Sequence, residues 1–199
     1  MDEGTFEYSI RGILGDQLER GRFYTNSLVI APFDNIEVGA TWNLDRSVGP
    51  FRWGIKYQIL DNQREDDFIS LAVGLDNNTG LTGAAHSDEQ PYIVASRDFG
   101  DHWTWYLGYI HFDGDDNDVY GGFNYRWNDQ WQVRAEYLGQ DDNNEALISG
   151  GVRYDWTKHI DLSLWATNDS LSDDTTVTLE FALNGDLRDL TLDNESITN

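Results

Sequence analysis

The sequence predicts an all-β fold, an up-and-down antiparallel transmembrane β-barrel of about twelve strands. Apolar and polar residues alternate from end to end, as in FNYRWNDQWQVRAEY at residues 123–137. This period belongs to β-strands, whose successive side chains point to opposite faces. We find no convincing helical stripe. Tight turns alternate with longer, more acidic loops along the chain. This alternation of short and long connections is typical of membrane barrels.

The first four strands are expected at residues 4–14, 22–31, 35–45 and 51–60. The third and fourth alternate most clearly, since each places apolar residues in one phase and charged residues or glycine in the other. The apolar phases are Ile36, Val38, Ala40 and Trp42, and then Phe51, Trp53, Ile55 and Tyr57. The second strand, around YTNSLVIA, is ambiguous in phase.

The next four strands are expected at 67–75, 91–98, 102–112 and 118–127, and the last four at 130–139, 145–156, 159–167 and 175–184. Most show the same two phases, but the sixth, around YIVASRDF, is ambiguous. We assign residues 1–185 to one barrel domain and residues 186–199 to a polar C-terminal tail, because no linker or composition shift divides the chain.

The connections predict the two ends of the barrel. PFDN, FGDH, WNDQ and WTKH are tight, whereas GDQLERG, DNNTGLTGAAHSDEQ, DGDDND, QDDNNE and NDSLSDD are longer or more acidic. Two connections depart from the rule: DRSVGP is not long, and DNQRED is not tight. Short turns at one end and long loops at the other are expected of the outer-membrane type of barrel.

The distribution of charge indicates which face of the strands points into the barrel and which faces lipid. The chain carries a net charge of −23, yet the polar phase of the strands mixes acidic and basic residues almost evenly. We interpret this phase as an enclosed interior and the apolar phase as the lipid-facing surface. The residues expected to line the interior are Arg52, Lys56, Arg97, Arg126, Arg134, Glu136, Arg153, Asp155, Asp161 and Glu180.

Aromatic residues are expected at both membrane interfaces, where an amphipathic ring contacts the lipid headgroups. They fall beside the tight turns and, at the other end, toward the longer loops. The expected interface aromatics are Trp103, Trp127, Trp131 and Trp156 at the first end, and Trp42 and Trp53 at the second.

Several functions are not supported by the residues. Cysteine is absent and the four histidines are scattered, so we predict no enzyme and no cofactor. The acidic excess argues against nucleic acid as a partner. The loop Asp113–Asp118 lacks the glycine and the glutamate of a calcium-binding EF-hand, although the acidic loops could hold divalent cations loosely.

At YTNSLVIAPFDNIEVGATW and ISLAVGLDNNTGLTGAAHSDEQPYIVASRDFGDHWTWYLGY the chain resembles bacterial outer-membrane barrels of the YjbH type. This resemblance covers about the first half of the chain and implies a bacterial outer-membrane location and a link to exopolysaccharide. Such barrels usually end on an aromatic residue, whereas here VTLEFALNG precedes a polar tail. A domain cut from a longer protein, or an engineered chain, would explain this departure.

We therefore expect a narrow passive pore or a plugged surface protein that contacts lipid or detergent, with anionic saccharides or small anions as candidate solutes. The first alternative is a soluble β-sandwich or barrel that binds carbohydrate, and the second is a designed barrel without a natural substrate. The membrane barrel and the soluble fold disagree about adjacent residues. Val133 contacts lipid and Arg134 the interior in the membrane barrel, whereas Val133 is core and Arg134 is surface in the soluble fold.

Overall fold

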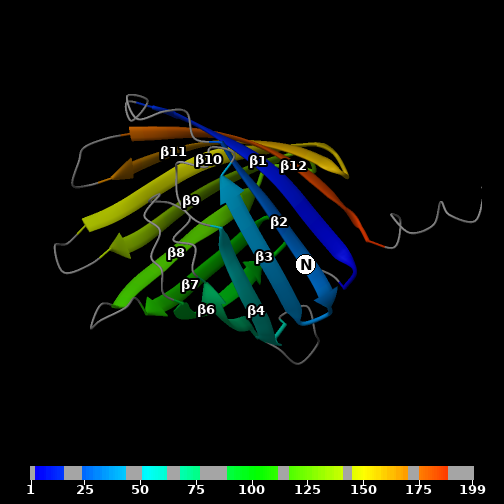
Figure 1. Cartoon of the computed structure of the whole chain (residues 1–199), viewed down its shortest axis with the longest axis vertical. Helices are drawn as coiled ribbons and strands as arrows, with labels where there is room; N and C mark the ends of the chain where they lie inside the picture. The colour runs from blue at the N-terminus through cyan, green and yellow to red at the C-terminus, as the bar shows by residue number, and fades with distance from the viewer. Residues whose placement is uncertain are drawn as a thin grey trace, which may run out of the picture.

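The computed structural model describes residues 3–15, 24–43, 51–61, 68–76, 89–111, 117–140, 145–169 and 175–187. Its strands form one closed antiparallel barrel and lie oblique to the barrel axis (Figure 1). In the described part of the chain, no helix is long and apolar enough to cross a membrane.

Twelve strands make up the barrel, and all twelve were expected from the sequence. Their bounds are β1 Thr5–Gly15, β2 Tyr24–Phe33, β3 Ile36–Asn43, β4 Arg52–Leu60, β5 Ser70–Asp76, β6 Gln90–Phe99, β7 Trp103–His111, β8 Asn117–Arg126, β9 Trp131–Gln140, β10 Glu145–Thr157, β11 Ile160–Asp169 and β12 Thr175–Asp186. The prediction of an up-and-down barrel is confirmed.

Each strand pairs with its neighbours in sequence, and β1 pairs with β12 to close the sheet. In that closing pair Ile10 lies opposite Phe181 and Thr5 lies opposite Asp186. Closure leaves no exposed sheet edge, so every strand has a backbone partner on both sides. Of the expected C-terminal tail, Asp186 belongs to β12 and Leu187 follows it, whereas residues 188–199 lie outside the described part.

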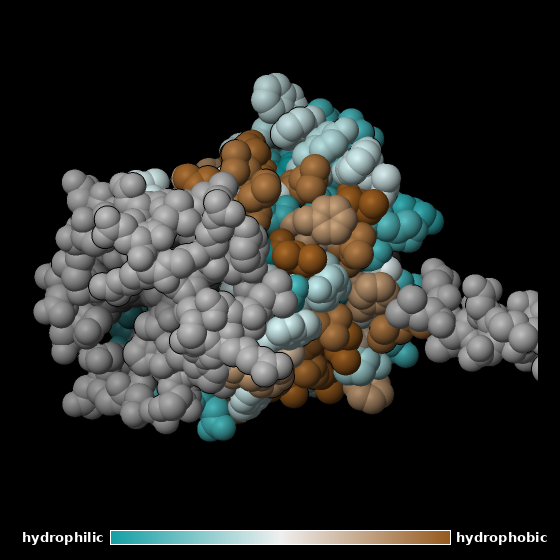
Figure 2. All heavy atoms as spheres, turned by 45° about the horizontal axis from the view of Figure 1, so that its top comes forward, coloured by the Kyte–Doolittle hydropathy of each residue, from teal (hydrophilic) through white to brown (hydrophobic). Residues whose placement is uncertain are grey.

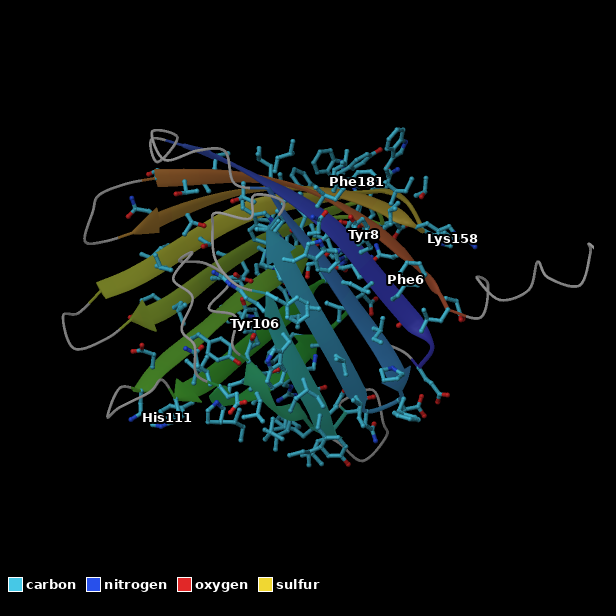
Figure 3. The ribbon with its side chains drawn as sticks, viewed as in Figure 1. Phe6, Tyr8, Tyr106, His111, Lys158 and Phe181 are labelled. Carbon is cyan, nitrogen blue, oxygen red and sulfur yellow. The ribbon has the colours of Figure 1, made fainter. Side chains whose placement is uncertain are left out.

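The outer surface of the barrel is apolar. Large apolar side chains such as Leu107, Ile148 and Leu179 are exposed at mid-strand, and Val133 is 37% exposed. Figure 2 shows apolar residues gathered over the side of the barrel, and Figure 3 shows Phe181 projecting outward from β12. The apolar phase therefore does not form a core. The soluble alternative required Val133 to lie in such a core.

The inner surface is built from the alternate residues, most of which are small, polar or charged. Ser9, Ser149, Asp161 and Ala182 are almost completely buried. Because side chains alternate between the faces of a strand, an exposed apolar residue fixes its neighbours as inward-pointing. The candidate site therefore lies inside the barrel.

Candidate functional site

Nine of the ten residues expected in the interior lie on the inner face of the barrel by strand register. Each alternates with exposed apolar residues or lies opposite another inward residue on the next strand. They are Arg52, Lys56, Arg126, Arg134, Glu136, Arg153, Asp155, Asp161 and Glu180. Arg52 and Glu180 are buried, and Arg126 is exposed at the tight-turn end of β8.

Arg97 does not lie in the interior, so the expectation for this residue is wrong. In the β6–β7 register Arg97 lies opposite Trp105, and Ala95 lies opposite Leu107, which are both exposed on the outer face. Its guanidinium lies over the ring of Phe68, with 3.3 Å between the guanidinium carbon and the ring centroid. Tyr92, Val94 and Ser96 take the inward positions of β6 instead.

A polar network on the inner face spans four strands, β9 to β12, around Arg153. The guanidinium of Arg153 donates to Asp155 at 2.7 Å and pairs with Asp161 at 2.8 Å. Gln132 donates to the second oxygen of Asp155, and Asn184 donates to Asp161 at 2.7 Å. Asp161 is only 2% exposed, so Arg153 and Asn184 compensate a carboxylate that is withdrawn from water.

Two further ion pairs join neighbouring strands on the inner face. Arg11 on β1 lies 3.0 Å from Glu180 on β12, across the seam that closes the barrel. Lys56 on β4 lies 2.6 Å from Glu37 on β3. Each pair connects adjacent strands, so the charges are held close to the wall.

A mixed cluster surrounds Arg134 on β9. Its guanidinium donates to Asn124, lies 3.7 Å from Glu136, and lies 5.1 Å from the ring of Trp165. Trp165 on β11 lies opposite Gly151 on β10 and points inward. The interior thus presents an aromatic face beside a cation.

Aromatic rings pack over glycines on the inner face, a site feature that was not predicted from the sequence. Across neighbouring strands Tyr92 lies opposite Gly74, Tyr120 opposite Gly108, Tyr106 opposite Gly122, and Trp165 opposite Gly151. A Cβ at any of these glycines would collide with the ring of its partner. The glycines of the polar phase were the available signal, because glycine in a strand often marks a close approach.

Water reaches the charged groups of the interior. The side chains of Lys56, Arg134 and Arg153 keep exposed fractions of 34%, 36% and 30% although they point into the barrel. Their partners Glu37 and Asp155 are less exposed. Accessible charges on an inner face indicate a hydrated interior rather than a dry one.

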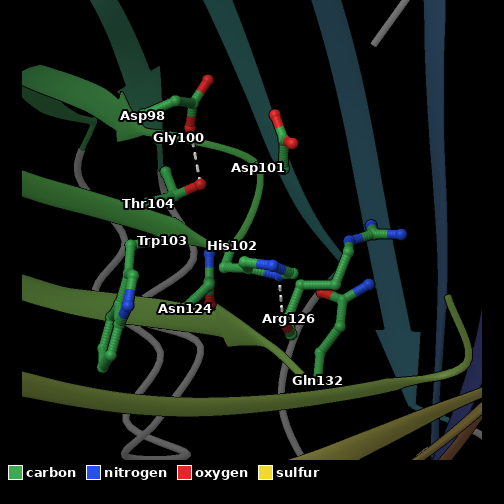
Figure 4. A pocket seen from close by; sticks show the side chains of 9 residues that line it. All are labelled: Asp98, Gly100, Asp101, His102, Trp103, Thr104, Asn124, Arg126 and Gln132. Carbon is green, nitrogen blue, oxygen red and sulfur yellow. Dashed lines mark hydrogen bonds between the residues drawn. The ribbon is translucent and has the colours of Figure 1, made fainter. Parts of the chain in front are cut away.

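A polar pocket of about 240 Å³ lies at the tight-turn end (Figure 4). Thr104 donates to Asp98 at 2.6 Å, and the ring of His102 hydrogen-bonds to the carbonyl oxygen of Arg126 at 2.8 Å. The turn between β6 and β7 is held by Gly100, whose φ of 61° favours glycine. Among the described residues, the Arg126 guanidinium forms no ion pair.

The expected interface tryptophans lie on the outer face. Trp103, Trp127, Trp131 and Trp156 are exposed and flank the tight turns. Trp103 packs against Tyr125, with ring centroids 4.4 Å apart. Trp42 and Trp53 are half-buried near the other end of their strands, where Trp42 lies 6.4 Å from Tyr8.

The acidic loops fall largely outside the described residues, including positions 113–116. Within the described ranges, no three His, Cys, Asp or Glu residues form a group that could hold a metal ion. The expectation of loosely held divalent cations therefore stays a prediction.

No protein family and no curated protein matches the chain by sequence. Solved structures do match by fold. The KdgM porin superposes with a TM-score of 0.61 at 14% identity, over 89% of this chain and 98% of that chain. The chain has the fold of an outer-membrane porin. A second structure, of the KdgM porin in complex with disordered oligogalacturonate, gives a TM-score of 0.63.

Two other structures share this porin fold. The Acinetobacter baumannii outer membrane protein Omp33 gives a TM-score of 0.59 at 10% identity, over 92% of this chain and 99% of that chain. A Rhodopseudomonas blastica porin variant gives 0.51 at 15% identity, and the match covers 55% of that longer chain. These neighbours are outer-membrane barrels, which supports the predicted location and gives no separate evidence for the YjbH type.

Proposed function

We propose that the chain is a passive pore of the bacterial outer membrane through which small ions and short saccharides pass. One observation carries the proposal: water-accessible charged side chains line the inner face behind an apolar outer surface. Lipid favours the apolar surface, and a hydrated interior lets the charges keep part of their solvation. The porin fold of the neighbours agrees with this function.

Saccharides are the solute class that the inner face suits best. Tyr92, Tyr106, Tyr120 and Trp165 offer ring faces, against which the apolar face of a sugar ring can pack. The carboxylates and guanidinium groups beside them accept and donate hydrogen bonds to hydroxyls. The oligogalacturonate of the KdgM complex is a saccharide, and the resemblance to YjbH-type barrels extends the proposal to exopolysaccharide fragments.

Anionic saccharides are a second candidate because Arg126, at the tight-turn end of the interior, forms no ion pair with a described residue. Taken together, the described charges of the inner face favour neutral solutes over anionic ones, because acidic residues outnumber basic ones. The acidic residues include Glu7, Glu37, Asp76, Asp98, Glu136, Asp155, Asp161 and Glu180, and the basic residues are Arg11, Arg52, Lys56, Arg126, Arg134 and Arg153.

Catalysis is not part of the proposal. The three described histidines are bound to backbone carbonyls or an asparagine: His102 to Arg126, His159 to Asn184, and His111 to Asn117. None of these hydrogen bonds is the serine–histidine or carboxylate–histidine contact that a hydrolase would need.

The test uses two adjacent residues of β12 in a chain that has no native cysteine. Thr178 points inward, opposite Trp165, and Leu179 is exposed on the outer face. Single-channel conductance is recorded for Thr178→Cys and Leu179→Cys before and after reaction with a charged thiosulfonate. We expect the reagent to reduce conductance through Thr178→Cys only.

Equal responses from the two variants, or no conductance from the folded protein, would reject the pore. Liposome swelling then compares a neutral oligosaccharide with a uronate oligosaccharide of the same length. Faster entry of the neutral sugar supports the first candidate solute, and faster entry of the uronate supports the second.

A further inference from the structure

The outer surface contains one feature that passage of solutes does not use, an apolar hollow of about 500 Å³ beside Arg97. Its lining includes Ala95, Phe99, Trp105, Leu107 and Gly121. Gly121 carries no side chain, so the sheet surface is lower there than over the neighbouring aromatics. The hollow follows β6, β7 and β8 on the face that meets lipid.

Arg97 places a positive charge at the edge of this hollow. Its guanidinium lies over Phe68 at 3.3 Å and over Phe99 at 4.8 Å from the ring centroids. Among the described residues it forms no ion pair with a carboxylate. Rings hold the flat face of a guanidinium, while its N–H groups stay available at the edge for an acceptor.

A cation on the lipid-facing side of a barrel is costly unless it lies near the interface and meets an anion. Arg97 is two residues from the end of β6 and close to the turn at Gly100. Trp103 and Trp105 stack beside it on β7, with centroids 6.4 Å apart. The charge therefore lies at headgroup depth, and the apolar hollow extends from it toward the middle of the strands.

The same residues indicate which leaflet is involved. Short turns face the periplasm in outer-membrane barrels, and Arg97 lies at the short-turn end. The periplasmic leaflet is made of glycerophospholipid, whose phosphate accepts several hydrogen bonds from one guanidinium. Lipopolysaccharide occupies the opposite leaflet.

We propose that Arg97 and the hollow beside it form a binding site for one glycerophospholipid of the periplasmic leaflet. The guanidinium, held by Phe68 and Phe99, binds the phosphate, and one acyl chain lies against Ala95, Leu107 and Gly121. This site rests on the proposed membrane location but not on the pore. A barrel that conducts normally can therefore still fail the test below.

The test measures lipid retention by native mass spectrometry of the folded protein released from a neutral detergent. The protein is titrated with dioleoylphosphatidylglycerol, and separately with dioleoylglycerol, which lacks the phosphate. Arg97→Gln removes the cation, Ala95→Phe fills the hollow, and Lys158→Gln is the matched control. Lys158 is a cation in the turn between β10 and β11 (Figure 3), at the same end of the barrel, whereas the hollow follows β6, β7 and β8.

We expect the wild type and Lys158→Gln to retain one phosphatidylglycerol molecule and to bind dioleoylglycerol weakly. Arg97→Gln should weaken retention by about tenfold, the effect expected of losing a hydrogen bond to a charged group. Ala95→Phe should weaken it with the cation still present. Heat-modifiable gel migration shows that each variant is folded.

Three results would overturn the site. Equal retention by Arg97→Gln and Lys158→Gln would remove the role of the cation. Preferential retention of lipopolysaccharide would assign the hollow to the other leaflet. A dimer that Arg97→Gln abolishes, with unchanged lipid retention, would show that a second copy of the chain occupies the face.

Discussion

Trp165 on β11 packs over Gly151 on β10, on the inner face of the barrel. A Cβ at Gly151 would lie 2.5 Å from a ring carbon of Trp165 and 2.5 Å from the carbonyl oxygen of Leu164. The second contact is with backbone, which cannot move aside as a flexible side chain can. The glycine therefore fixes where the ring lies beside Arg134.

The first prediction follows from that contact. Gly151→Ala should lower the free energy of unfolding by about 1–3 kcal/mol, the usual cost of forcing an extra methyl group into a filled space. Urea unfolding in detergent micelles, followed by the shift between compact and unfolded gel bands, measures it. Gly150→Ala is the adjacent control, because a Cβ there meets only one atom within 4 Å, at 3.9 Å. A similar loss in both variants would contradict the role of the ring.

The second prediction concerns the network around Arg153. Arg153→Gln leaves Asp155 and the buried Asp161 without their cation, so we expect a loss of about 1–3 kcal/mol in unfolding free energy. Adding Asp161→Asn should recover part of the loss, because the more deeply buried of the two unpaired carboxylates is then neutralised. A double-mutant cycle measures the coupling. If the two losses simply add, the ion pair contributes nothing to stability.

The third prediction tests the outward apolar surface at mid-strand. Leu107, in the middle of β7, is 62% exposed. Leu107→Arg should cost about 2–4 kcal/mol in a lipid bilayer, because the charge must enter the hydrocarbon layer. Leu107→Met keeps the apolar character and should cost less than about 1.5 kcal/mol. Unfolding in lipid vesicles compares the two, and a tolerated arginine would argue against lipid contact at this position.

The fourth prediction addresses ion selectivity at the tight-turn end. Arg126→Glu reverses one exposed charge beside Asp98 and Asp101 and should shift the permeability ratio toward cations. The change should be at most about fivefold, since two unit charges in contact in water interact by about 1 kcal/mol. The reversal potential under a salt gradient measures the ratio. Lys158→Glu makes the same charge change in the turn between β10 and β11 and should leave the ratio nearly unchanged.

Much of the fold could be predicted from alternation alone. In β4 the phase of Trp53, Ile55 and Tyr57 is unambiguous, and these residues face outward in the barrel. In β6 both phases carry apolar residues, so the sequence offered no reason to place Arg97 outward. Only its pairing opposite Trp105 settled the phase, and register between strands is a non-local property.

The candidate site also has a part that the sequence predicts and a part that only the structure shows. The charged residues of the inner face could be named because each lies in the polar phase of its own strand. Their partners could not, since Arg153 contacts Asp161 and Asn124 contacts Arg134 only across neighbouring strands. Trp165 shows the limit most clearly, because a large apolar ring suggests the lipid face until its position opposite Gly151 is known.

The sequence by itself determined the number of strands and the apolar outer phase, because both depend on neighbouring residues with a period of two. It also determined the alternation of short and long connections, because turn residues are local in the chain. The tertiary structure decided the closure of β1 on β12, the outward position of Arg97, the inward position of Trp165 and the pairing of the inner charges. Closure and register bring together residues far apart in the chain. A one-residue shift in register would move every side chain of a strand to the other face.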